Sequence, residues 1–117
     1  MIIKTVIPGY EAYIHNLFRP STLFNDQMTY RFENNYGASI VFHQGTYGYE
    51  DGLVELAVIE WKKDGSTYEI SYSTEITNDV IGYLDVESAK SLLEKIKNIK
   101  RFKKWLTWID FRVIIYL

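Results

Sequence analysis

The sequence predicts an α+β fold, in which an antiparallel β-meander of four to five strands packs against one C-terminal amphipathic helix. The strict alternation of apolar and polar residues over 28–33 is typical of a half-buried strand. Aromatic residues make up 16% of the chain, and they favour strands because their rings pack well on a pleated surface. Apolar residues at helical spacing over 86–99 predict the helix.

The 117 residues are expected to form a single domain. We divide it into an N-terminal extension (1–27), a core (28–99) and a basic and apolar C-terminal segment (100–117). The chain has no cysteine, which excludes disulfides and thiolate metal sites and is compatible with a reducing cytosol. No signal-peptide pattern and no run of about 20 apolar residues is present, so we expect a cytoplasmic protein without a transmembrane segment.

The first 26 residues carry weaker patterns. Residues 1–7 are apolar and β-branched and predict a short strand or an irregular lead-in. Apolar residues at helical spacing predict a short helix over 10–18, which Arg19-Pro20 ends because the residue before a proline avoids helical geometry. A loop is expected over 19–26.

The first hairpin is predicted over 28–43. Strand 28–33 is followed by the turn Asn34-Asn35, since asparagine tolerates a positive φ angle, and then by strand 38–43. Three glycines in 44–52 indicate a loop.

A longer strand is predicted over 53–61, and apolar residues on both of its faces indicate a central position in the sheet. The turn at 62–65 contains Asp-Gly, which supplies positive φ angles. Strand 67–73 then returns, with Tyr68, Ile70 and Tyr72 expected to point inward. Residues 74–84 are expected to be irregular.

The helix over 86–99 is the clearest element of the sequence. Asp85 is placed to cap it, because its carboxylate can accept from the exposed N–H groups of the first turn. Its apolar stripe consists of Val86, Ala89, Leu92, Leu93, Ile96 and Ile99. The β-branched residues of 105–117 favour a final strand, and a helix continuing over 101–110 is the alternative.

Charge is distributed unevenly along the chain. Residues 1–89 carry five basic and thirteen acidic side chains, a net charge of −8, whereas residues 90–117 carry eight basic and two acidic ones, a net charge of +6. Such an asymmetry bears on the choice of partners rather than on the fold.

Two surface patches follow as candidate contact sites. The first, in the glycine-containing loop and the strand after it, is a predicted protein contact made of Tyr47, Tyr49, Glu50, Asp51, Glu55 and Glu60. The second is a basic patch suited to nucleic acid or an anionic membrane surface, made of Lys95, Lys97, Lys100, Arg101, Lys103, Lys104, Trp105 and Trp108. Surface lysines are common without any such role, and the acidic body would repel a polyanion.

The tyrosines as a group offer a further recognition surface, because tyrosine supplies rigid contact area at interfaces. The residues concerned are Tyr10, Tyr30, Tyr36, Tyr47, Tyr49, Tyr68, Tyr72 and Tyr83. Packing within the sheet is the competing interpretation, and it applies first to Tyr30, Tyr68 and Tyr72.

No catalytic motif is present. The sequence lacks G-x-S-x-G, the phosphate loop G-x-x-x-x-G-K-[ST] and the dinucleotide fingerprint G-x-G-x-x-G. His15 and His43 have no partner at a metal-ligand spacing, and Glu50-Asp51 falls outside any EF-hand pattern. We therefore predict no catalytic residue, no metal site and no cofactor, and expect a protein that is not an enzyme.

Three segments carry a resemblance to a family of small uncharacterised phage and prophage proteins. They are TYRFENNYGASIV (29–41), the stretch containing DGL and ELAV (51–58) and ITNDVIGYL (76–84), and with the closing helix the resemblance covers about residues 28–99. The resemblance implies a small accessory protein that acts by binding a host or defence protein, with inhibition of a CRISPR effector as one such role. It carries no substrate, cofactor or site residue over to this chain.

The sequence leaves one structural alternative open at the C-terminus. An apolar strand late in the chain can close its own sheet or pair with a second copy, which would make a homodimer.

Overall fold

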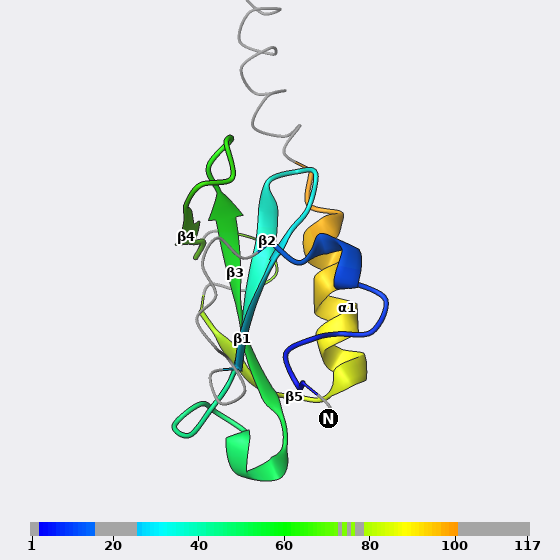
Figure 1. Cartoon of the computed structure of the whole chain (residues 1–117), viewed down its shortest axis with the longest axis vertical. Helices are drawn as coiled ribbons and strands as arrows, with labels where there is room; N and C mark the ends of the chain where they lie inside the picture. Colours follow the sequence, from blue (N-terminus) through cyan, green and yellow to red (C-terminus); the bar gives the residue numbers. More distant parts are fainter. Residues whose placement is uncertain (1–2, 16–25, 73, 75, 77–78, 101–117) are drawn as a thin grey trace, which may run out of the picture.

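The computed structural model of the chain describes residues 3–15, 26–72, 74, 76 and 79–100 (Figure 1). These residues form two layers, an antiparallel five-stranded sheet and one helix, so the predicted α+β class is confirmed. The elements are η1 (Glu11–Tyr13), β1 (Asp26–Arg31), β2 (Tyr36–Phe42), η2 (Tyr49–Asp51), β3 (Val54–Trp61), β4 (Tyr68–Ile70), β5 (Ile81–Leu84) and α1 (Val86–Lys97).

The strands follow one another as a meander, in the order β1-β2-β3-β4, and β5 also pairs with β3. Strand β3 has β2 along one edge, while its other edge is divided between two strands. β4 pairs with the C-terminal end of β3, where Trp61 lies opposite Tyr68, and β5 pairs with the N-terminal end, where Val54 lies opposite Leu84. The central position predicted for this strand is therefore confirmed.

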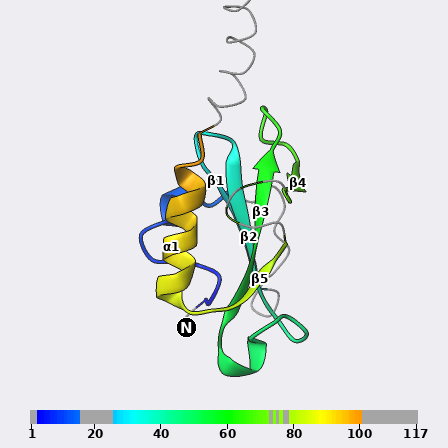
Figure 2. The same cartoon turned by 180° about the vertical axis from the view of Figure 1, so that it is seen from behind.

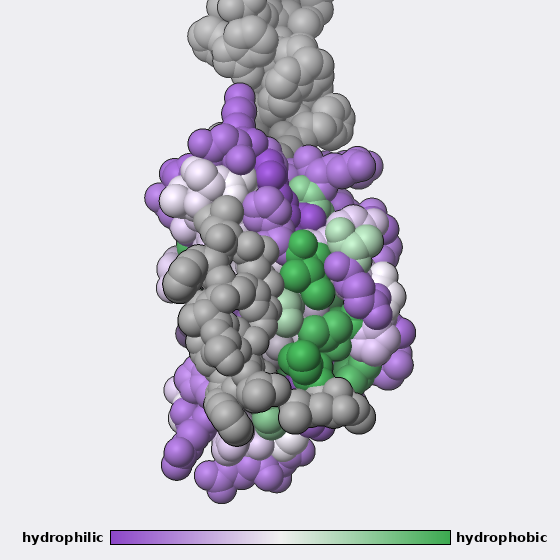
Figure 3. Space-filling model, viewed as in Figure 1, coloured by the Kyte–Doolittle hydropathy of each residue, from purple (hydrophilic) through white to green (hydrophobic). Residues whose placement is uncertain are grey.

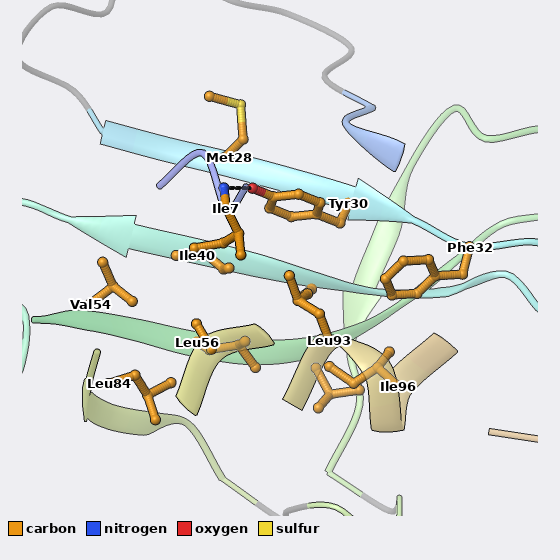
Figure 4. Packing of buried hydrophobic residues seen from close by; sticks show 13 residues of the cluster. Ile7, Met28, Tyr30, Phe32, Ile40, Val54, Leu56, Leu84, Leu93 and Ile96 are labelled. Atoms are coloured by element: carbon orange, nitrogen blue, oxygen red, sulfur yellow. Dashed lines mark hydrogen bonds between the residues drawn. The ribbon is translucent and has the colours of Figure 1, made fainter. Parts of the chain in front are cut away.

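The main core lies between the sheet and α1, which runs along one face of the strands (Figures 1 and 2). Figure 4 shows Leu93 and Ile96 of α1 pointing toward Leu56, and both helix residues are fully buried. The alternation of β1 places Met28, Tyr30 and Phe32 on this same face.

The N-terminal segment is part of this core. Ile7 is buried, and the hydroxyl of Tyr30 donates to the Thr5 carbonyl (2.6 Å) and accepts from the Ile7 N–H (2.9 Å; Figure 4). Tyr10 and Tyr13 pack their rings around Phe32. Residues 3–15 therefore belong to the packed domain rather than extending from it.

The buried Tyr30 hydroxyl predicts a loss of stability at alkaline pH. Burial raises its pKa from the ordinary 10.0 to about 12, because the phenolate would lose hydration. Since the pKa is higher in the folded protein, this contribution to the free energy of unfolding is fully present below pH 10 and is lost as pH rises through about 12. Urea titrations at a series of pH values, followed by tryptophan fluorescence, measure it.

Tyr30→Phe is the control for this pH dependence. The variant should show a flatter decline over the same pH interval. Near neutral pH it should be less stable by about 1–3 kcal/mol, because the Thr5 carbonyl and the Ile7 N–H lose their partner. Equal pH dependence in the two proteins would contradict the assignment.

The opposite face of the sheet has its own buried side chains. Trp61 is 2% exposed, and its indole N–H donates to the Tyr30 carbonyl (2.9 Å) across Gly37 of β2. The Trp61 ring also meets His15 and Tyr68 edge to face, with ring centroids 4.8 and 4.9 Å apart. These contacts explain why β3 is apolar on both faces.

Both ends of α1 are capped by side chains. The carboxylate of Asp85 accepts from the Ser88 N–H (2.8 Å), which confirms the predicted N-terminal cap. At the other end the side-chain amide of Asn34 donates to the carbonyls of Ile96 (2.9 Å) and Ile99 (2.8 Å). The turn between β1 and β2 therefore holds the end of the helix, since Asn34 bonds the Ile96 carbonyl in the last turn of α1 and the Ile99 carbonyl just after it.

Both predicted turns are present. Asn35 has a φ angle of +65° between β1 and β2, as expected for an asparagine turn. Gly65 has a φ angle of +73° between β3 and β4, and it alone of the predicted Asp-Gly pair is in the left-handed region.

The predicted helix over 10–18 is wrong for the part that the structure describes. η1 ends at Tyr13, and Ile14 is already extended and forms a bridge with Tyr30 of β1. A short isolated helix is only marginally stable, so pairing with the edge of β1 prevails over the helical pattern. Residues 16–18 lie outside the described residues.

Two predictions for residues 67–84 are wrong. Ile70 and Tyr72 are 45% and 55% exposed rather than inward, because β4 has only three residues and its alternation points Ile70 away from the face that α1 covers. Residues 81–84 form β5 rather than an irregular stretch, because the N-terminal half of β3 offers an edge for pairing.

The exposed Val86 (46%) also departs from the predicted apolar stripe of the helix. The predictions for 101–117 lie outside the described residues.

Candidate functional site

One end of the molecule gathers exposed tyrosines and acidic side chains from segments far apart in the sequence. The loop between β2 and β3, which contains η2, lies at the lower end of Figure 1 and contacts β5. We call this surface the tyrosine end and define it by Tyr47, Tyr49 and Tyr83, with the carboxylates of Glu50 and Asp51. Hydrophilic residues cover this end of the molecule in Figure 3.

The rings of Tyr47 and Tyr83 are the most exposed large hydrophobic side chains of the described residues, at 59% and 63%. They stack on each other, with centroids 6.3 Å apart and an angle of 26° between the ring planes. Stacked rings at this separation attract each other, so the pair presents one continuous aromatic surface to solvent.

The backbone beneath the pair is tightly constrained. A Cβ atom on Gly48 would lie 3.0 Å from the Tyr83 Cα, and one on Gly82 would lie 2.4 Å from the Tyr47 Cβ. Tyr83 itself has a φ angle of +58°, which is uncommon for an aromatic residue, and its N–H donates to the Tyr47 carbonyl (3.3 Å). The loop and β5 therefore meet backbone to backbone, and this contact fixes where both rings lie.

Two further contacts hold the loop in place. The carboxylate of Glu55 on β3 accepts from the Tyr47 N–H (2.9 Å), so Glu55 positions the loop rather than lying free on the surface. Tyr49 packs against Phe42 with ring centroids 4.9 Å apart, and the Lys4 ammonium lies 6.0 Å from the centroid of Phe42.

The structure brings most of the predicted protein contact together and separates one member from it. Tyr47, Tyr49, Glu50 and Asp51 share the loop, and Glu55 lies directly beneath it. Glu60 lies five residues further along β3, on the opposite face of the sheet and roughly 17 Å away along the strand. Glu60 is therefore not part of the tyrosine end.

Tyr83 belongs to the tyrosine end and is absent from the predicted patch. Nothing in the sequence places it next to Tyr47, because the contact depends on β5 pairing with β3 and on close approach at two glycines. The only local signal is Gly82, since an isolated glycine in an extended stretch often marks a close backbone approach.

The described part of the basic patch lies at the opposite end, where α1 finishes (Figures 1 and 2). Lys95 and Lys97 occupy the last turn of α1, where lysines interact favourably with the helix dipole, and Lys100 follows it. The ammonium of Lys97 lies 5.3 Å from the centroid of the Tyr13 ring. Three basic and two tryptophan side chains of the predicted patch lie outside the described residues: Arg101, Lys103, Lys104, Trp105 and Trp108.

Ionisable groups around Lys97 stabilise the charged helix end. Hydrogen bonding to Tyr13 raises the pKa of Lys97, and the hydrogen bond from Tyr10 to Glu94 (2.5 Å) lowers the pKa of the Glu94 carboxyl. Burial, together with this acidic partner, raises the pKa of Tyr10 to about 12. These contacts attach the N-terminal segment to α1, so Lys97 already has a structural role.

Each of the two histidine rings is hydrogen-bonded to a backbone carbonyl. The ring of His15 is hydrogen-bonded to the Gly65 carbonyl (3.0 Å), and that of His43 to the Gln44 carbonyl (3.0 Å). Over residues 3–15, 26–72, 74, 76 and 79–100, no group of three His, Asp or Glu side chains is arranged to hold a metal ion. In the same part of the chain, no helix is both long and apolar enough to cross a membrane.

The tyrosine end is thus an exposed surface of aromatic rings and carboxylates, held by backbone contacts between the loop and β5. Its composition suits contact with another macromolecule, because tyrosines provide contact area at little cost in conformational entropy. No family model, known protein or solved structure matches the chain significantly.

Proposed function

We propose that this chain is a small non-enzymatic accessory protein of the phage type, which acts by binding another protein in the cytoplasm of the host cell. The exposed and stacked Tyr47–Tyr83 pair carries the proposal. Side chains that contribute strongly to protein interfaces are enriched in tyrosine, and a pair held by its backbone loses little freedom on binding.

The partner we propose is a host protein, and a defence component such as a CRISPR effector is the leading candidate. Two features support it: the sequence resemblance over residues 28–99 to small phage and prophage proteins, and the net charge of −8 over residues 1–89. Such an acidic body complements the basic channels in which nucleic-acid enzymes hold their substrates.

The alternative function is binding of nucleic acid or an anionic membrane through the basic patch. Lys95 and Lys100 are exposed and available for it, whereas Lys97 is held against Tyr13. The acidic body opposes this function, since it would repel the same polyanion.

The experiment is affinity capture of the tagged full chain from lysate of infected host cells, with and without nuclease, followed by mass spectrometry. We expect a stoichiometric host protein that survives nuclease treatment. The charge-reversal variant Glu50→Lys with Asp51→Lys should lose most of that partner, because both carboxylates are exposed at the tyrosine end. Capture that disappears with nuclease would instead support the basic patch.

A further inference from the structure

The geometry of the Tyr47–Tyr83 pair restricts how a partner can use it. A planar group placed between the two rings would make one stacking contact of about 3.5 Å with each of them. The ring planes would therefore have to lie about 7 Å apart. The ring centroids are 6.3 Å apart, so nothing planar fits between the rings. A partner group must therefore stack on an outer face, and the high exposure of both rings leaves such faces accessible.

The charges around the pair select the kind of group that can stack there. The three segments that meet at the tyrosine end, 3–7, 43–56 and 81–87, carry five carboxylates and one ammonium, that of Lys4. An aromatic ring presents a negative face to a stacked group, and nearby carboxylates add to this potential. An anionic partner would be repelled, and a cationic one attracted.

The molecule already contains two cation–ring contacts of this type. The ammonium of Lys4 lies over Phe42, the ring that packs against Tyr49, and the ammonium of Lys97 lies over Tyr13. In both cases a basic side chain of the chain covers an aromatic ring. Tyr47 and Tyr83 pack against each other, and both rings stay open on the outside.

We propose that the tyrosine end binds a basic segment of its protein partner through an arginine whose guanidinium stacks on the exposed tyrosine pair. This inference rests on the proposed function and specifies its partner chemistry. Arginine fits better than lysine, because a planar guanidinium stacks on a ring and donates in the plane to carboxylates at the same time. Glu50 and Asp51, which are exposed and follow Tyr47 by three and four residues, are the carboxylates that we assign to such a donor.

Glu55 has a different part in this recognition. Its carboxylate is engaged by the Tyr47 N–H, so it is a positioning residue that holds the loop. Glu55→Gln keeps an acceptor oxygen at that place but removes one of the five carboxylates, so it should weaken the binding of arginine and lysine peptides alike and preserve the arginine preference.

The test uses the labelled full chain and two acetylated, amidated peptides of equal charge, Gly-Arg-Gly-Arg-Gly and Gly-Lys-Gly-Lys-Gly. Titrations followed by ¹³C–¹H spectra of the tyrosine rings report each ring separately. We expect the arginine peptide to shift the signals of Tyr47 and Tyr83 and to bind about three- to fivefold more tightly than the lysine peptide. Tyr72 is the internal control, because it is 55% exposed and follows β4, which pairs with the C-terminal end of β3, whereas β5 pairs with the N-terminal end.

Two variants separate the ring from the charges. Tyr83→Leu should reduce binding of the arginine peptide to the level of the lysine peptide. Glu50→Gln with Asp51→Asn should weaken both peptides and preserve the arginine preference. Gly82→Ala tests the arrangement without altering a charge or a ring, because its Cβ would lie 2.4 Å from the Tyr47 Cβ and displace that side chain.

Equal affinity for the two peptides, or equal shifts at Tyr72, would overturn the proposal. Shifts of Tyr47 and Tyr83 that grow with protein concentration in the absence of peptide would overturn it too, by assigning the surface to a second copy of the chain. If capture of a host protein requires Tyr83 but the chain binds the two peptides equally, this inference is refuted and the proposed function stands. If the chain prefers the arginine peptide but captures no host protein, the arginine site is supported and the proposed function is refuted.

Discussion

Replacing Gly37 with alanine is expected to destabilise the fold by about 3 kcal/mol or more, the upper range for overpacking a core. The added Cβ would lie 1.7 Å from the carbonyl oxygen of Tyr30 and 2.8 Å from its carbon. Neither strand can move aside, because Gly37 lies opposite Arg31 in the β1–β2 ladder. The same Tyr30 carbonyl accepts from Trp61, so moving it would also break that hydrogen bond.

Gly45→Ala is the matched control for Gly37→Ala. Gly45 has a φ angle of +101°, and a Cβ there would meet nothing within 4 Å. The free energy of unfolding of the control variant should therefore fall by only about 1–2 kcal/mol, the cost of the unfavourable backbone angle. Urea denaturation followed by tryptophan fluorescence compares the two variants, and equal losses of stability would contradict the close approach of β2 to Tyr30.

Leu93→Ala is expected to lower the free energy of unfolding by about 2–5 kcal/mol. Leu93 is fully buried between α1 and the sheet, so its truncation removes apolar burial and leaves a cavity. The neighbouring Leu92 is only partly buried against the same core, and Leu92→Ala should cost about 1 kcal/mol. The same denaturation experiment measures both variants, and a reversed order would show that α1 presents a different face to the sheet.

Much of the fold follows from local patterns in the sequence. The helix is predictable because a cap and an apolar stripe lie within a few residues of each other, at Asp85 and over 86–99. Turns at Asn35 and Gly65 are predictable because these residue types adopt a positive φ angle at little cost. Such features depend only on near neighbours in the chain.

The remaining features depend on contacts between distant segments. Strand β5 forms because the N-terminal half of β3 offers an edge for pairing. The sequence of β5 does not reveal it, because Gly82 weakens the strand pattern of 81–84. The N-terminal segment belongs to the core because Tyr30 holds it with two hydrogen bonds, although nothing local to residues 3–10 indicates a partner. The prediction for the face of β4 is wrong because alternation defines two faces without showing which one the helix covers.

The candidate site likewise contains residues that the local sequence predicts and one residue that only a contact between distant segments brings in. A loop rich in glycine and tyrosine was visible in the sequence, and Tyr47, Tyr49, Glu50 and Asp51 do lie together in it. Glu60 lies outside the site because residues five apart in a strand point to opposite faces, so the strand pattern alone separates it from Glu55. Tyr83 joins the site only through the pairing of β5 with β3, which the sequence does not reveal.

The most direct test of the account is the affinity of the captured host protein for the wild-type chain and for two double variants. The first is Tyr47→Ala with Tyr83→Ala, and the second, as control, is Ile70→Ala with Tyr72→Ala, which removes similarly exposed side chains at β4. We expect at least about a hundredfold loss for the first variant, as for the removal of two strongly contributing interface residues, and little change for the second. Equal affinity of all three proteins would show that the partner binds elsewhere and would contradict the assignment of the tyrosine end.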